Sequence, residues 1–159
     1  MTPAGHARLT NELDQLKRFE RPAVSKAIET AREHGDLKEN AEYHAAKDKQ
    51  GMIEARIRLI EARIALAQVI DPLRLSGSRI SFGATVTLLD LDTEDERTYA
   101  IVGEDEANFK HGLISYKSPI ARGILGRLEG DDVEVPVADG VRSFEILTVS
   151  FQEIPLPAE

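Results

Sequence analysis

Isoleucine recurs every three or four residues in one stretch of this 159-residue chain, and the repeat limits what that stretch can fold into. The repeating apolar positions are Ile53, Ile57, Ile60, Ile64 and Ala67. Alternating spacings of four and three place them along one seam of a helix, with charged residues between them facing water. The repeat predicts a long helix that buries a narrow stripe, and Asp71-Pro72 is expected to end it.

A second apolar stripe precedes this one. The predicted helix starts after Thr2, a possible N-cap, with Pro3 at its first position. Its stripe consists of Leu9, Leu13, Leu16, Val24, Ile28 and Ala31. The last three lie on a face offset from the simple continuation of the first three, and Pro22 between them is expected to bend the helix or shift its register.

Two such helices joined by a polar stretch predict an antiparallel α-helical coiled-coil hairpin over residues 1–75. Each arm holds about 25–30 residues and would span about 40–45 Å at a rise of ~1.5 Å per residue. The stretch 31–46, A-R-E-H-G-D-L-K-E-N-A-E-Y-H-A-A, falls at the turn between the arms. We therefore expect an acidic tip that stands clear of any core.

The second half changes period after a polar linker at 76–79. Strands are predicted at 84–89, 98–102, 132–135 and 144–149, with an acidic turn at 92–96 and a turn at Asp139-Gly140. A short helix is predicted from Ser118-Pro119 to about Gly126. The expected fold class is α+β, with a small α+β domain over residues 80–159.

Composition excludes several classes of protein. The chain has no cysteine, hence no disulfide and no thiolate metal site, and no apolar run approaches the roughly 20 residues of a membrane span. The N-terminus lacks the pattern of a signal peptide, so we expect a soluble cytoplasmic protein without membrane contact. Residues 1–75 carry 13 basic and 12 acidic side chains, whereas residues 76–159 carry 7 and 16. The acidic half favours a protein partner, and any nucleic-acid contact belongs to the first half.

Asp36 and Glu39 at the expected tip allow two interpretations. The sequence D-L-K-E fits a capping box, with Asp36 as N-cap and Glu39 bonding back to its amide. Two carboxylates three residues apart could also hold Mg²⁺, which takes one or two carboxylates and completes its octahedron with water and phosphate oxygens. Two ligands bind Mg²⁺ weakly, so such a pair would work only where another molecule completes the coordination sphere.

The other polar residues near the tip are less specific. His34 and His44 match no common zinc spacing and are expected to be surface groups. Arg32, Lys38, Lys47 and Lys49 could form a solvated helix face or contact a phosphate backbone, and the sequence leaves both open. The chain has no G-x-S-x-G, P-loop or Rossmann glycine pattern, so an independent enzyme is not expected.

Several long motifs in the right order make the chain resemble the GreA/GreB family of bacterial transcript cleavage factors. They are E-R-P (20–22), the stretch 31–46, A-Q-V-I-D (67–71), F-G-A-T-V-T-L (82–88), I-V-G-E-D-E-A (101–107) and I-S-Y-K-S-P-I-A-R-G-I-L-G (114–126). The tip reads H-G-D-L-K-E-N, as in the GreA type. The hairpin at 136–144 and the tail from Phe151 depart from the family pattern.

The resemblance implies a coiled coil joined to an FKBP-like domain that docks on the rim of RNA polymerase's secondary channel. By position, Asp36 and Glu39 match the paired acids that share a catalytic Mg²⁺ with the polymerase, with no metal held stably by the factor alone. Arg32 and Lys47 match a basic patch that contacts the nascent RNA 3′ end. Support of the tip is expected from Asn40, Glu42 and Tyr43, and docking from Ser118, Pro119 and Ile120.

The expected function is therefore to rescue arrested polymerase by stimulating its Mg²⁺-dependent RNA cleavage, as a monomer that is not catalytic alone. One alternative is an anti-cleavage paralogue that occupies the channel and inhibits. Another is a coiled-coil interaction module, which predicts a stable dimer. A peptidyl-prolyl isomerase is a third, suggested by fold analogy alone, and the aromatic-lined pocket that it needs is not expected in this chain.

Overall fold

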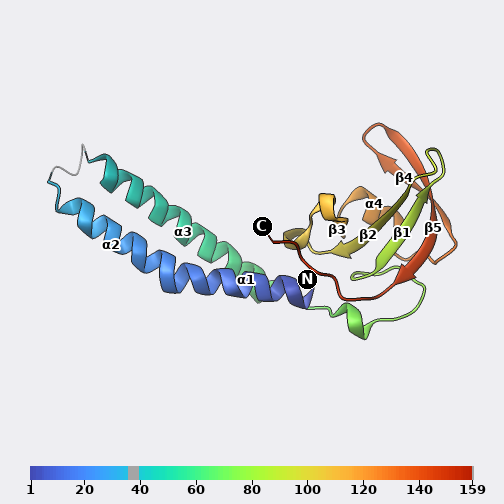
Figure 1. Ribbon diagram of the computed structural model, residues 1–159, viewed down its shortest axis with the longest axis horizontal. Coiled ribbons are helices and arrows are strands. Elements are labelled where there is room, and N and C mark those ends of the chain that lie inside the picture. Colours follow the sequence, from blue (N-terminus) through green and yellow to red (C-terminus); the bar gives the residue numbers. More distant parts are fainter. Residues whose placement is uncertain (36–39, 159) are drawn as a thin grey trace. The chain divides into compact units, whose positions relative to one another are not determined.

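A computed structural model describes residues 1–35 and 40–158. The chain forms two compact units: His6–Ala67 make one, and Met1–Gly5 together with Gln68–Glu159 make the other. We call them the helical unit and the sheet unit. The expected mixture of a helical N-terminal region and a C-terminal sheet domain is confirmed (Figure 1). No helix in the described ranges is both long enough and apolar enough to cross a membrane.

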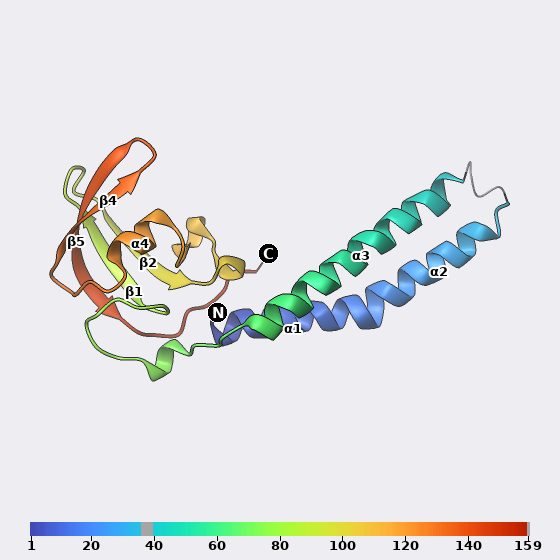
Figure 2. The same cartoon turned by 180° about the vertical axis from the view of Figure 1, so that it is seen from behind.

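Three α-helices build the helical region: α1 (Pro3–Gln15), α2 (Arg21–Arg32) and α3 (Ala41–Leu66). In both Figure 1 and Figure 2, α2 and α3 lie side by side. The last turn of α2 and the first turn of α3 lie at the same end of the pair. The predicted stripes face each other, and their buried members are Leu9, Val24, Ile28, Ala31, Ile53, Ile57 and Ile60. Burying a large aliphatic side chain contributes about 1.5–3 kcal/mol, so this seam is the main source of stability for the pair.

Ion pairs on the rims of the seam fix which residues lie opposite one another. Arg56 of α3 donates to both carboxylate oxygens of Glu12 at 2.7 and 2.8 Å. Arg21 makes the same fork with Glu54 at 2.8 and 3.0 Å. Exposed pairs of this kind contribute less than about 1 kcal/mol each, so they set the register more than the stability.

The offset between the two halves of the first stripe is absorbed by a π-helical turn, η1 (Leu16–Glu20). The seam requires seven residues from Leu16 to its next equivalent position, but Val24 lies eight residues on. In η1 the Arg21 amide donates to the Leu16 carbonyl five residues back, so this turn takes up one extra residue. The register shift predicted near Pro22 is confirmed, and its form is a π-turn.

The ends of α3 differ from expectation. The helix ends at Leu66, five residues before Asp71, because the following backbone bonds to Met1: the Ile70 amide donates to the Met1 carbonyl at 2.9 Å. Asp71 instead caps the short 3₁₀-helix η2 (Pro72–Arg74) by accepting from the Leu73 amide. At the other end the N-cap is Asn40, while the predicted capping box of Asp36 and Glu39 lies outside the described residues.

The sheet unit contains five strands: β1 (Thr85–Asp90), β2 (Glu96–Val102), β3 (Leu113–Ser115), β4 (Asp132–Val137) and β5 (Gly140–Ser150). Their order is β3-β2-β1-β5-β4, and among the strands that the structure describes only the β2–β3 pair is parallel. The four predicted strands are confirmed. β3 was not predicted, because three residues carry no readable alternation, and β5 exceeds its predicted range because it pairs with both β1 and β4.

One face of the sheet carries the core of this unit, which α4 (Pro119–Ile124) covers by packing on β4 and β3. Alternate strand residues point to this face, and the fully enclosed members include Val86, Leu88, Ile101, Val135 and Ile146. This alternation is what a half-buried antiparallel sheet requires. The packed core therefore holds the ends of the strands in place. Polar residues that point to the same face of the sheet lie at those strand ends.

A buried carboxylate holds the first residues of the chain to the sheet unit. Glu106, in the 3₁₀-helix η3 (Glu104–Glu106), is 1% exposed and accepts hydrogen bonds from the Thr2 hydroxyl, from the Thr2 amide at 2.9 Å and from the Gly103 amide at 3.2 Å. Thr2 caps α1, as predicted, by accepting from the Gly5 amide at 3.1 Å. Gly5 is required there, because a Cβ would lie 2.5 Å from the Glu106 side chain.

Candidate functional site

The candidate site lies at the end of the α2–α3 pair. The sequence assigned seven residues to this tip, and five of them are described: Arg32, Asn40, Glu42, Tyr43 and Lys47. Asp36 and Glu39, the proposed acids, lie outside the described residues.

Asn40 joins the two helices at this end. Its side-chain nitrogen donates to the carbonyl of Ala31 in the last turn of α2 at 2.6 Å. Its side-chain oxygen accepts from the amide of Tyr43 in the first turn of α3 at 3.0 Å, which is an N-cap interaction. One amide therefore fixes the two points from which the segment with Asp36 and Glu39 starts and ends.

A cation and two rings lie beside this bridge. The Arg32 guanidinium lies 6.0 Å from the centre of the Tyr43 ring, and the Tyr43 and His44 rings meet edge to face at 5.6 Å. His34 lies 3.8 Å from the Glu42 carboxylate, so His34 and Glu42 also connect the end of α2 to the start of α3. Lys47, one turn further along α3, donates to Gln50 at 3.3 Å. The structure thus groups Arg32, Asn40 and Tyr43 closely.

The tip offers a limited donor set for a metal. Within residues 1–35 and 40–158, no group of three or more His, Asp or Glu side chains is arranged to hold a metal ion. The carboxylates at Asp36 and Glu39 are the type of ligand that Mg²⁺ takes, in the number that leaves most of its octahedron to water and phosphate. Their chemistry therefore fits the predicted ion.

The predicted docking residues begin α4 in the sheet unit. The Ser118 hydroxyl accepts from the Ala121 amide at 3.3 Å and so caps this helix. Pro119 is exposed at the first helical position, and Ile120 packs partly against the core. Next to them Lys117 bonds to Glu104 at 3.2 Å, and this bond raises the pKa of Lys117 above its usual value. Ser118 and Ile120 thus have structural roles, while Pro119 is available on the surface.

Comparison with known proteins identifies the family. Residues 1–69 match the model described as "Transcription elongation factor, N-terminal", and residues 75–151 match "Transcription elongation factor, GreA/GreB, C-term". The chain belongs to the GreA/GreB family of transcription elongation factors. It is 59% identical to the transcription elongation factor GreA of Cereibacter sphaeroides, over 95% of this chain and 96% of the relative.

Other members of the GreA/GreB family are similarly related. Identity is 58% to GreA of Ruegeria pomeroyi, over 95% of this chain and 96% of the relative, and 55% to GreA of Hyphomonas neptunium, over 96% and 97%. Among solved structures, GreA factor homolog 1 (Gfh1) of Thermus thermophilus is 27% identical with a TM-score of 0.42, over 94% of this chain and 96% of that chain.

Sequence reasoning missed one feature of this GreA/GreB-family protein. It is a hollow of about 210 Å³ in the sheet unit, which is lined by the rings of Tyr99, Phe109 and Phe144 together with four charged side chains. The three rings come from β2, from the 3₁₀-helix η4 (Phe109–His111) and from β5. No local pattern joins them, because β2 and β5 come together only by pairing with β1, and Phe109 reaches Tyr99 from the loop after β2.

Proposed function

We propose that this GreA/GreB-family chain reactivates backtracked bacterial RNA polymerase by stimulating the polymerase's own cleavage of the RNA 3′ end. The observation that carries the proposal is 59% identity to a GreA over nearly the whole chain, together with the intact tip motif H-G-D-L-K-E-N at 34–40. In this proposal the protein is cytoplasmic, acts as a monomer through the polymerase and has no catalytic activity alone.

The fold that we propose for this task is an antiparallel coiled coil over 1–75, a linker at 76–79 and an FKBP-like docking domain over 80–159. The 26 residues of α3 span about 39 Å at ~1.5 Å per residue. A pair of helices that length, buried only along its seam, is slender enough to enter the secondary channel of the polymerase. The length of α3 and the narrow seam support this placement.

At the tip, Asp36 and Glu39 would hold a Mg²⁺ ion that the polymerase site completes. When bound there, Mg²⁺ would polarise the scissile phosphate and lower the pKa of a water molecule. The contribution of this chain is to deliver two carboxylates on a slender support. The two hydrogen bonds of Asn40 support the proposal, because they restrain both ends of the segment that carries the acids.

Other tip residues would contact or orient the RNA. Arg32 and Lys47 are proposed to contact phosphates of the extruded 3′ segment, since both are exposed cations near the tip. Tyr43 and Glu42 would support the tip through their contacts with Arg32 and His34. Docking at the polymerase rim is assigned to Ser118, Pro119 and Ile120.

A cleavage experiment tests the tip acids directly. A stalled, backtracked elongation complex is incubated with Mg²⁺ and the wild-type protein, Asp36→Asn or Glu39→Gln, and RNA shortening is timed. Each variant should slow shortening by more than about 100-fold, the scale of removing a group that stabilises a transition state. Glu33→Gln is the matched control, because it removes the same charge from an exposed position nearby and should cleave like wild type.

Binding to polymerase is measured in parallel by fluorescence anisotropy of labelled protein. Asp36→Asn and Glu39→Gln should bind as wild type does. If both variants shorten RNA at the wild-type rate, the shared-metal mechanism is wrong. If the wild-type protein binds polymerase but does not shorten the RNA, the anti-cleavage alternative is established. If light scattering shows a stable dimer and the protein does not bind polymerase, the interaction module is established.

A further inference from the structure

Most of the residues that line the aromatic hollow of the sheet unit come from one face of the sheet. Asp90, Arg97 and Arg142 each lie two positions along their strand from a buried core residue of that face: Leu88, Tyr99 and Phe144 respectively. Side chains two apart on a strand point to the same face, so the polar groups stand beside the rings. The hollow is thus an extension of the core surface beyond the part that α4 covers.

The hydroxyl of Tyr99 marks the hollow as more than a surface irregularity. Tyr99 is 6% exposed, and its ring lies 6.0 Å from that of Phe109. In the described part of the chain the hydroxyl has no hydrogen-bond partner, yet it is not sealed from solvent. A buried tyrosine usually finds a partner for its hydroxyl. Because Tyr99 lines the hollow, its hydroxyl is the donor that we assign to an occupant.

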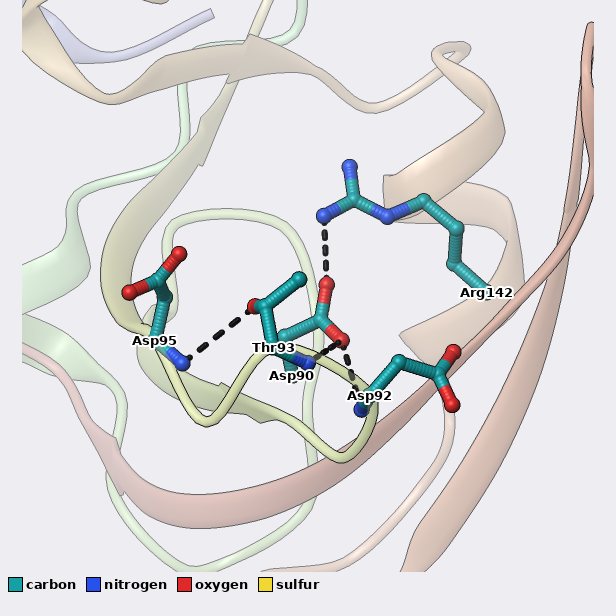
Figure 3. A network of polar contacts seen from close by, with 5 residues as sticks. All are labelled: Asp90, Asp92, Thr93, Asp95 and Arg142. Atoms are coloured by element: carbon teal, nitrogen blue, oxygen red, sulfur yellow. Dashed lines mark hydrogen bonds and ion pairs between the residues drawn. The ribbon is translucent and has the colours of Figure 1, made fainter.

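The Arg142 side chain, a cation that lines the hollow, is held in place by the buried carboxylate of Asp90. Asp90 accepts from Arg142 at 2.5 Å and from the amides of Asp92 and Thr93 at 2.9 and 3.2 Å, as Figure 3 shows. The other terminal nitrogen of Arg142 points away from Asp90 in this view. The guanidinium also lies 5.3 Å from the centre of the Phe144 ring. Asp90 thus accepts three hydrogen bonds, while the bond from Arg142 to Asp90 uses one terminal nitrogen of the guanidinium.

Arg97 adds a second cation on the rim and has no ion pair with any described residue. The lining therefore combines three aromatic rings with three groups that can donate hydrogen bonds, Tyr99, Arg97 and Arg142. It also holds two carboxylates that can accept them, Asp90 and Asp95. Such a surface is complementary to an apolar side chain that carries both hydrogen-bond acceptors and donors next to it. The peptide groups on either side of an apolar residue have that arrangement, because each offers one carbonyl and one amide.

The size of the hollow decides the class of occupant. Its volume of about 210 Å³ exceeds the ~150 Å³ in which an apolar cavity accommodates benzene. It is smaller than the ~300 Å³ at which pockets for drug-sized ligands begin. The hollow therefore has room for one aromatic or branched aliphatic side chain.

We propose that the hollow lined by Tyr99, Phe109 and Phe144 is a second protein-binding site, which takes one apolar side chain of a partner's peptide segment. The flanking carbonyls of that segment accept hydrogen bonds from the Tyr99 hydroxyl and from Arg97 or Arg142. This site is distinct from the residues 118–120 assigned to docking, and its occupation does not depend on the tip acids.

The probe is N-acetyl-leucine methylamide, which presents one apolar side chain between two peptide groups. It is titrated into the full-length ¹⁵N-labelled protein and followed by amide chemical shifts. Shifts should be confined to residues around the hollow and should saturate with a dissociation constant in the millimolar range, as expected for about a dozen heavy atoms. N-acetyl-glycine methylamide, which lacks the side chain, should not saturate.

Variants separate the contributions of the hydroxyl and the rings. Tyr99→Phe should weaken binding about 2- to 10-fold, the effect of one hydrogen bond. Phe109→Ala should weaken it as well, and the fold should tolerate this change because Phe109 is 66% exposed. Tyr116→Phe is the control, since Tyr116 lies against Phe82 rather than at the hollow. Linear, scattered shifts, equal shifts with the glycine probe, or unchanged binding by Tyr99→Phe would overturn the proposal.

Discussion

Asn40 illustrates how much depends on one amide group at the tip. The donor half of its side chain bonds to Ala31, and the acceptor half bonds to the amide of Tyr43. Aspartate offers only the acceptor, and serine is too short to match both partners at once. The amide is therefore the chemical group that can connect the end of α2 to the start of α3.

Loss of this bridge should be measurable as stability. Asn40→Ala should lower the free energy of unfolding by about 1 kcal/mol, the typical value of an N-cap. Urea unfolding followed by the helical signal at 222 nm measures the change. Asn108→Ala is the control, because Asn108 precedes η4 without a capping side-chain bond and its loss should matter by less than about 0.5 kcal/mol. Equal effects of the two variants would contradict the assigned role.

The Asp90 and Arg142 pair predicts a dependence of stability on pH. The hydrogen bond from Arg142, followed by the one from the Asp92 amide, holds the pKa of Asp90 below its usual 3.8. A lowered pKa means that folding favours the ionised form, so the contribution is fully present above about pH 4 and is lost as pH falls through the folded pKa. Asp90→Asn should melt at a lower temperature than wild type at pH 7.

The difference in melting temperature between wild type and Asp90→Asn should shrink as the pH is lowered below 3.8. Asp92→Asn serves as the comparison, because only its backbone amide takes part in the network and that amide is retained. A difference that stays constant from pH 7 to pH 2 would show that the ionised state of Asp90 is not what stabilises the fold.

At this scale the sequence predicted residue types better than partners. Thr2 as a cap for α1 followed from its position before Pro3. The two hydrogen bonds of the Asn40 side chain and the approach of Tyr99 to Phe144 could not be predicted in the same way. These contacts depend on how far apart in space two distant segments lie, which local spacing does not contain.

At the scale of elements, the π-turn η1 accommodates one extra residue between the two halves of the first apolar stripe. If the extra residue is its cause, removing one residue there should restore a continuous α-helix. The variant that deletes Phe19, which is 60% exposed, and carries Pro22→Ala to avoid a proline inside the helix should keep the seam aligned. Its free energy of unfolding should differ from that of wild type by less than about 1 kcal/mol, because no apolar contact is lost.

Deleting Leu59 is the matched control, since Leu59 is also exposed but lies in α3, which has no extra residue. This deletion rotates the seam after Ile57 and should cost several times more, at about 1.5–3 kcal/mol per displaced isoleucine. Urea unfolding compares the two. Equal losses would mean that η1 has some cause other than the offset.

Elements with a long apolar repeat could be predicted from the sequence. Short elements, and a helix end set by a hydrogen bond to a distant residue, could not. The heptad spacing from Ile53 to Ile64 predicted α3 correctly in type but not in length. The position where α3 ends depends on Met1, whose carbonyl accepts a hydrogen bond from the Ile70 amide. No sequence pattern around Ile70 indicates a partner so far back in the chain. β3 was missed for a similar reason, since its three residues become a strand only by pairing with β2.

At the scale of the whole molecule, Glu106 connects residues that are 104 positions apart in the chain. Glu106→Ala should leave the buried amides of Thr2 and Gly103 without partners, at a cost of about 1–3 kcal/mol per group. Thermal unfolding should show a clear drop. Glu104→Ala removes an exposed acid from the same 3₁₀-helix and should change stability by less than about 0.5 kcal/mol. If both substitutions have the same small effect, the Glu106 contacts do not stabilise the fold.

The contact between Thr2 and Glu106 also has a topological consequence. Because Met1–Gly5 belong to the sheet unit, the helical unit is an insertion within it rather than a neighbour in series. Two covalent connections join the units, one after Gly5 and one before Gln68. During synthesis the opening residues must therefore wait for most of the chain to emerge before they find their partners. An exchange of the helices between relatives would require two splice points instead of one.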